Sequence, residues 1–139
     1  MKLSTKSEYA CLALIYLTEH YGQGLIKVES ISHRKNIPKK FLEQILLTLK
    51  RSGFLKSRRG SKGGYTLAKD PSRISLAEII RLMDGALAPV ESVSIYFYES
   101  TPIEQSKALL AVFRDIRNYS AQKLESTTFA DLILKEGRK

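Results

Sequence analysis

The sequence predicts a mainly α-helical protein with one small β-hairpin, in which a winged helix-turn-helix domain is followed by a long helix. Three observations lead to this fold class. Two helical patterns, at residues 28–35 and 38–52, are separated by only a few residues, as in a helix-turn-helix. A short alternating ribbon with a glycine-rich tip follows them. A long amphipathic pattern then begins at Ile103.

Length and hydropathy indicate one folded domain that does not enter a membrane. The 139 residues are 43% hydrophobic, which is enough for a packed core. No apolar run reaches the roughly 18 residues of a transmembrane helix. Glu8 interrupts the apolar stretch near the N-terminus, where a signal peptide would be continuous. We therefore expect a cytoplasmic protein without a membrane partner.

The positive charge is concentrated in the first half of the chain. Residues 1–73 hold 15 Lys and Arg against 5 Asp and Glu, whereas residues 74–139 hold 8 against 9. The net charge of +9 therefore comes almost entirely from the first half. This asymmetry favours binding of a polyanion by that half, and a basic surface that serves only solubility is the alternative.

The cysteine and histidine residues do not suggest a disulfide, a metal site or a catalytic site. Cys11 is the only cysteine and lies in an apolar helical pattern, which favours a small core residue over a redox-sensing thiol. One cysteine supplies neither a disulfide nor a thiolate cluster, so we expect no metal and no cofactor. His20 and His33 fall on separate predicted helices without a nucleophile or paired carboxylates. No catalytic residue emerges, and the chain is not expected to be an enzyme.

The first helix is expected to begin with a capping box. Thr5 and Glu8 have the required spacing of a hydroxyl and a carboxylate three residues later. The apolar residues that follow occupy more than one face, so this helix is expected to be buried on several sides. It runs to about His20 and ends at the glycines of residues 22–24.

The helix-turn-helix is predicted from local turn signals. Val28–Lys35 forms a short polar helix, and Asn36 tolerates the left-handed conformation that a tight turn needs. Pro38 suits the first turn of the second helix, which ends at about Ser52 before Gly53.

The second helix of this motif has an apolar face and a polar face. The expected core residues are Phe41, Leu42, Ile45, Leu46 and Leu49. The opposite face carries Lys40, Glu43, Gln44, Leu47 and Arg51. Lys and Gln side chains can bond base edges in the major groove, and Glu can accept from cytosine. The pattern thus predicts a recognition helix, with an ordinary charged surface helix as the alternative.

The ribbon that follows predicts a basic wing. Strands at residues 54–58 and 65–67 are joined by a tip at 59–64 that is rich in glycine and basic residues. Glycine lets the backbone approach a phosphodiester closely, and arginine at such a tip fits a narrow minor groove. A nucleotide-binding loop is the alternative, but GSKGG lacks the Walker spacing and a strand follows it.

One further helix completes the first domain. Ser75 is expected to cap a helix that runs through about Asp84 and stops at Gly85. Its expected inward residues are Leu76, Ile79, Ile80 and Met83. We therefore assign residues 1–85 to the winged helix-turn-helix domain.

Residues 86–102 form a connector between two prolines and contain an apolar, aromatic run at 95–98 with strand propensity. We interpret this run as packing against the core or a second subunit. The alternative is that it lines a site for an effector metabolite or a partner protein.

Residues 103–139 are expected to form a dimerisation helix, up to about Glu125, and a short terminal helix capped by Thr127 or Thr128. So long a helix projects beyond a small domain, and a second copy is the simplest partner for its apolar stripe. The expected dimer-interface residues are Leu109, Val112, Phe113, Ile116, Tyr119 and Leu124.

Three stretches of the chain, FLEQI, RSGFLKSRRGSKGGY and STTFADLI, resemble bacterial winged-helix transcription regulators of the Rrf-two type, typified by IscR, NsrR and CymR. The resemblance covers nearly the whole chain. It implies a homodimer that binds a roughly palindromic DNA operator sequence-specifically and regulates transcription, most simply as a repressor. The alternative is an interaction protein that keeps the fold but acts through a partner protein or a metabolite.

The resemblance also implies roles for individual residues. Gln44 matches a residue that contacts bases, Glu43 one that tunes sequence preference, and Arg59 one that enters the minor groove. Lys40 stands where a small hydroxyl residue is often found. The complete expected DNA-binding set is Lys39, Lys40, Glu43, Gln44, Arg51, Arg58, Arg59, Gly60, Lys62, Gly64 and Tyr65.

The resemblance does not extend to the cofactor. Many relatives carry three cysteines that hold an iron–sulfur cluster between the positions of Met83 and Ser106, and this chain has neither Cys nor His there. We therefore expect a member without the cluster, similar in type to CymR, that responds to an effector metabolite or a partner protein near residues 86–102.

Overall fold

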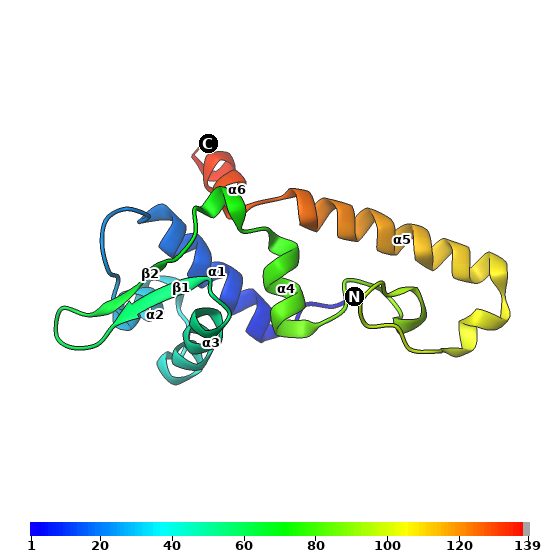
Figure 1. Cartoon of the computed structure of the whole chain (residues 1–139), viewed down its shortest axis with the longest axis horizontal. Coiled ribbons are helices and arrows are strands. Elements are labelled where there is room, and N and C mark those ends of the chain that lie inside the picture. The colour runs from blue at the N-terminus through cyan, green and yellow to red at the C-terminus, as the bar shows by residue number, and fades with distance from the viewer. Residues whose placement is uncertain (138–139) are drawn as a thin grey trace.

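The computed structural model describes residues 1–137, and the last two residues of the predicted terminal unit, 138–139, lie outside the described part. The molecule is elongated, with the hairpin at one end and the far end of the longest helix at the other (Figure 1). The elements are α1 (Thr5–Glu19), α2 (Val28–Lys35), α3 (Lys39–Arg51), β1 (Leu55–Arg58), β2 (Gly64–Leu67), α4 (Leu76–Asp84), α5 (Lys107–Ser126) and α6 (Phe129–Glu136). The predicted fold class is confirmed.

Helix α1 begins one residue earlier than the sequence predicted. Its N-cap is Ser4, whose Oγ accepts a hydrogen bond from the Ser7 amide at 3.1 Å. The backbone amide of Ser4 donates to the Asp84 carboxylate at 3.0 Å, and the Ser4 hydroxyl bonds the same carboxylate. Partial burial opposes ionisation of Asp84, but the hydrogen bonds from Ser4 outweigh it and hold the pKa of this carboxyl below its ordinary value. The expected cap at Thr5 was wrong because a distant residue fixes Ser4.

The helix-turn-helix follows the prediction closely. Asn36 adopts the left-handed conformation, with φ 54° and ψ 48°. The Ser32 hydroxyl donates to the Ile37 carbonyl at 2.6 Å and closes the turn. Pro38 is the N-cap of α3 and not a residue of its first turn. These contacts fix the direction in which α3 leaves the turn.

The inner face of α3 belongs to the main core, where Leu42, Ile45, Leu46 and Leu49 are buried. Phe41 was expected there but is 37% exposed. It lies at the rim of the core, where its ring meets that of Tyr9 edge to face with the centroids 5.5 Å apart. The apolar face of α3 is thus narrower than the pattern predicted.

Strands β1 and β2 form the predicted antiparallel hairpin, in register from Leu55 opposite Leu67 to Arg58 opposite Gly64. Tyr65 also exchanges two backbone hydrogen bonds of 2.8 Å with Ile26, which precedes α2. A Cβ atom at Gly64 would lie 2.5 Å from the Ile26 carbonyl oxygen, so this close approach requires glycine. The hairpin is therefore anchored to the start of the helix-turn-helix.

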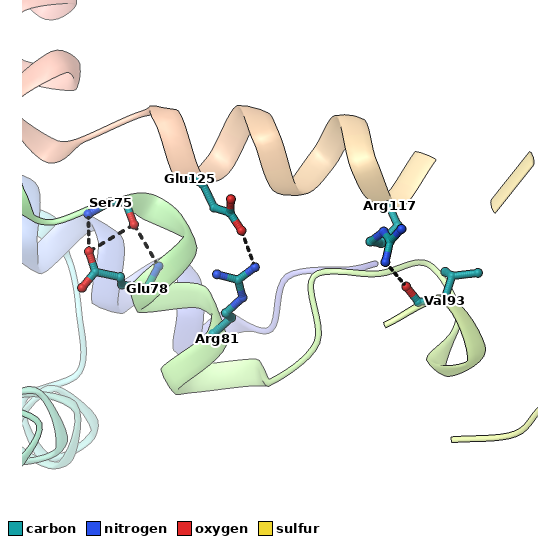
Figure 2. Close-up of polar contacts among 6 residues, drawn as sticks. All are labelled: Ser75, Glu78, Arg81, Val93, Arg117 and Glu125. Atoms are coloured by element: carbon teal, nitrogen blue, oxygen red, sulfur yellow. Dashed lines mark hydrogen bonds and ion pairs between the residues drawn. The ribbon is translucent and has the colours of Figure 1, made fainter. Parts of the chain in front are cut away.

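Helix α4 starts with a capping box. The Ser75 Oγ accepts from the Glu78 amide at 3.2 Å, and the Glu78 carboxylate accepts from the Ser75 amide at 3.1 Å (Figure 2). The adjoining Leu76 amide donates to the carbonyl of Thr127, immediately before α6, at 2.9 Å. The start of α4 is thereby tied to the start of α6.

Helix α6 packs into the core of the N-terminal half. Its N-cap is Thr128, one of the two expected residues, in a capping box with Asp131. Phe129 is fully buried in the main core, and its amide donates to the Ile74 carbonyl at 3.0 Å. Its apolar contacts are with residues of the N-terminal half in the main core.

The connector does not contain a strand. Residues 91–93 form a short 3-10 turn, and residues 95–98 are exposed by 46% to 69% without a strand partner. The strand propensity of this run was misleading because a strand needs a neighbour with which to pair. Four aromatic or apolar side chains are thus presented on the surface of the single chain.

Helix α5 begins at Lys107, later than predicted, because Pro102–Gln105 forms a separate 3-10 turn and Ser106 caps the helix. Most of its apolar stripe is exposed, whereas Phe113 and Leu124 are partly buried. Leu124 packs with Ala77 and neighbours on α4. Within the described part of the chain, no helix has both the length and the apolar character to cross a membrane.

Candidate nucleic-acid interface

The exposed face of α3 and the hairpin lie at the same end of the molecule, away from the far end of α5 (Figure 1). Lys40, Glu43 and Gln44 are exposed on the first half of α3, and Arg51 is exposed at its end. An exposed helix of this kind fits the width of the DNA major groove. The residues predicted to read bases are therefore accessible together on one helix.

Lys39 is paired within its own chain. Its Nζ lies 3.3 Å from the Glu29 carboxylate on α2, and both side chains are more than half exposed. A hydrogen bond from its own backbone amide, and then the contact with Lys39, hold the pKa of Glu29 below its ordinary value. An exposed ion pair of this kind is weak, so a DNA phosphate can replace Glu29 as the partner of Lys39.

The tip of the hairpin presents the predicted basic residues to solvent. Arg58 ends β1, and Arg59, Gly60 and Lys62 follow it, all exposed. Gly60 has a φ of 104°, which a residue with a side chain rarely adopts. Tyr65 is half-buried against the core, so it holds the hairpin in place beside α2.

Sequence reasoning missed two basic residues, Lys27 and Lys50. Together with Arg58 and Arg59 they line a hollow of about 320 Å³ between the start of α2, the end of α3 and the hairpin. Lys50 lies seven residues after Glu43, hence on the same face of α3, and this spacing was a usable signal. Lys27 was not recognisable, because only the bonds between Ile26 and Tyr65 bring it to the hairpin. Glu29 also lines this hollow, and the excess of four cations over one carboxylate favours a phosphate of the DNA backbone.

Comparison with known proteins identifies the family. The family model described as "Rrf2: Iron-dependent Transcriptional regulator" matches residues 3–135. The chain belongs to the Rrf2 family. The HTH-type transcriptional regulator CymR of Bacillus subtilis is 33% identical over 132 residues, which cover 95% of this chain and 89% of CymR.

Solved structures of Rrf2 proteins support the same assignment. The structure of CymR, described as the global cysteine regulator of B. subtilis, matches with a TM-score of 0.77 and 32% identity over 95% of each chain. IscR of T. potens matches with a TM-score of 0.77 and 28% identity, over 100% of this chain and 92% of IscR.

These comparisons confirm the predicted family and show that the chain is a DNA-binding transcription regulator. The family and the relatives are named for transcription regulation and not for an enzymatic activity. The alternative of an interaction protein that acts mainly through a partner is not favoured.

The iron in the family description does not fit the residues of this Rrf2 protein. Cys11 is the only cysteine, and within residues 1–137 no three His, Cys, Asp or Glu side chains gather as metal ligands. Burial raises the pKa of the Cys11 thiol to about 11, and the nearby Asp84 carboxylate adds to the shift. The thiol is therefore protonated at neutral pH and packs against the core, as the sequence favoured. Regulation through an iron–sulfur cluster does not carry over to this chain.

Proposed function

We propose that this Rrf2 protein acts as a homodimer on a roughly palindromic operator, at which it represses transcription by binding and not by catalysis. In this proposal α3 reads bases in the major groove and the hairpin enters the adjacent minor groove. The observation that carries it is the division of the molecule into a basic end with an exposed helix and hairpin, and an opposite end with an exposed apolar helix (Figure 1).

The dimer is supported by the spacing on α5. The exposed apolar residues are Leu109, Val112, Ile116 and Tyr119, with exposed fractions of 43%, 55%, 44% and 72%. They are separated by three, four and three residues, which is the spacing of a coiled-coil seam. A symmetric pairing of two α5 helices would remove all four side chains from water at once. Two-fold symmetry would in turn place two recognition helices on related half-sites.

Gln44→Ala is expected to relax base preference at one position in each half-site, because the amide of Gln44 is the group best suited to pair with a base edge. The measurement is in vitro selection of bound DNA by the full-length protein and by the variant. Gln105→Ala removes an exposed glutamine far along the chain from the recognition helix and should return the wild-type motif. A motif that is unchanged in Gln44→Ala would contradict base reading by this residue.

Arg59→Ala is expected to weaken operator binding roughly tenfold or more. The loss should be largest for operators with A·T-rich flanks, because a narrow minor groove concentrates negative potential around an inserted guanidinium. Fluorescence anisotropy titrations at one fixed salt concentration measure the effect. Arg114→Ala on α5 removes the same charge elsewhere, and an equal loss in the two variants would show that Arg59 contributes only net charge.

A further inference from the structure

Leu47 is an apolar residue on the outer face of α3, among the polar residues proposed to read DNA. It is 39% exposed, whereas the other leucines of this helix are buried. It follows Lys40 by seven residues and precedes Arg51 by four, so the three side chains lie in one row along the exposed face. Single exposed leucines are common on protein surfaces, so exposure alone assigns Leu47 no role. Its place in the middle of this row is the informative feature.

The surroundings of Leu47 leave an apolar spot between two groups of polar side chains. The next residue, Thr48, donates its hydroxyl to the Gln44 carbonyl at 3.0 Å, so this donor is engaged within the helix. Toward the hairpin, Leu47 lines the same hollow as Lys50 and Arg58. Leu47 therefore lies between the residues proposed to read bases and the cations that favour a backbone phosphate. In the major groove, both a base edge and its backbone come within reach of such a position.

A DNA base is a better partner for this spot than a second protein surface. The face around Leu47 carries Lys40, Lys50 and Arg51, which attract a polyanion and would repel a second copy of the same face. Thymine is the base that presents a methyl group in the major groove. A leucine side chain that packs against this methyl group removes apolar surface from water, which a polar side chain does not do. An apolar residue at this position thus favours thymine.

We propose that Leu47 is a specificity-determining residue that packs against the 5-methyl group of one thymine in each half-site. This proposal rests on the proposed function, in which α3 lies in the major groove, and it adds thymine preference to the reading by Gln44. Leu47 follows Gln44 by three residues, about 4.5 Å along the helix axis, against roughly 3.4 Å between successive base pairs. The thymine is therefore expected one or two base pairs from the position that Gln44 reads.

The test replaces thymines of the operator by uracil, which removes the methyl group and keeps the base pairing. The probe is a fluorescein-labelled palindromic duplex with the sequence that the full-length protein selects in vitro. Each thymine is replaced in turn, symmetrically in both half-sites, and the Kd is measured by anisotropy at one fixed salt concentration. Burial of one methyl group corresponds to about fourfold in affinity, so the wild type should lose about fifteenfold at one symmetric position.

Three variants separate the methyl contact from other effects of uracil on the duplex. Leu47→Ala should bind the thymine and uracil duplexes equally well at that position, because its side chain no longer reaches the methyl group. Leu47→Met keeps a long apolar side chain and should retain most of the discrimination. Leu134→Ala truncates an exposed leucine on α6 and should behave as the wild type at every position. All three changes are at exposed positions, so the fold is kept.

The proposal is overturned if uracil replacement causes the same loss in the wild type and in Leu47→Ala at every position. A uniform loss of affinity in Leu47→Ala would then mean that this side chain packs only against the sugar–phosphate backbone. A protein that selects no operator overturns the proposed function as well, whereas a selected operator without a Leu47-dependent thymine overturns only the role of Leu47. The two failures are therefore distinguishable.

Discussion

In the proposed homodimer, Ile116→Asp is expected to convert the dimer into a monomer and to reduce affinity for a palindromic operator by about 100-fold or more. Ile116 lies in the middle of the exposed seam of α5 and is itself 44% exposed in the single chain. An aspartate there would be buried without a partner against a second helix, which costs several kcal/mol. Affinity for the operator would fall because two linked DNA-binding domains bind far more tightly than two separate ones. Sedimentation velocity and anisotropy titrations measure the two effects.

Ala111→Asp provides the matched control for this change. Ala111 is exposed on the same helix but lies outside the three-four-three spacing of the seam. The Ala111→Asp variant introduces the same carboxylate on the same helix, so we expect it to leave both dimerisation and operator affinity unchanged. A dimer that survives Ile116→Asp would place the interface on another surface. A monomer that keeps full affinity would instead refute the paired reading of the operator.

Those parts of the fold that depend on residues close together in the sequence could be predicted. The turn between α2 and α3, with Asn36 in the left-handed conformation, follows from residue types within a few positions of one another. The capping box of Ser75 and Glu78 is equally local. The predicted cap of α1 failed because Ser4 is fixed by Asp84, 80 residues away. Periodicity on one helix contains no information about such a contact.

The same distinction applies to the site. The exposure of Lys40, Glu43 and Gln44 follows from the spacing of apolar residues along α3, because that spacing determines which face of the helix is buried. Lys27 lies beside Arg58 and Arg59 only because Ile26, which precedes α2, pairs with Tyr65 of the hairpin. The Arg81–Glu125 contact spans 44 residues and depends on the angle at which α5 returns over α4. No spacing rule predicts contacts that arise from packing between separate elements.

Phe129→Ala is expected to lower the free energy of unfolding by about 3–5 kcal/mol. Phe129 is fully buried in the main core, among residues of the N-terminal half. Its removal leaves a cavity that the surrounding helices cannot close, because backbone bonds to Ile74 and Leu76 hold the start of α6 in place. Denaturant unfolding at one fixed protein concentration measures the change, since unfolding of the proposed dimer would depend on concentration.

Leu134→Ala is the control on the same helix, because Leu134 is 62% exposed and its truncation should change stability by less than about 0.5 kcal/mol. The comparison of Phe129→Ala with Leu134→Ala shows whether α6 anchors α5 to the main core. If Phe129 is as important as its burial indicates, α6 anchors the C-terminal end of α5 to the N-terminal half of the chain. Movement of α5 would then be transmitted to α3 through the main core. A small effect of Phe129→Ala would instead mean that α6 can leave the core and that α5 moves independently of α3.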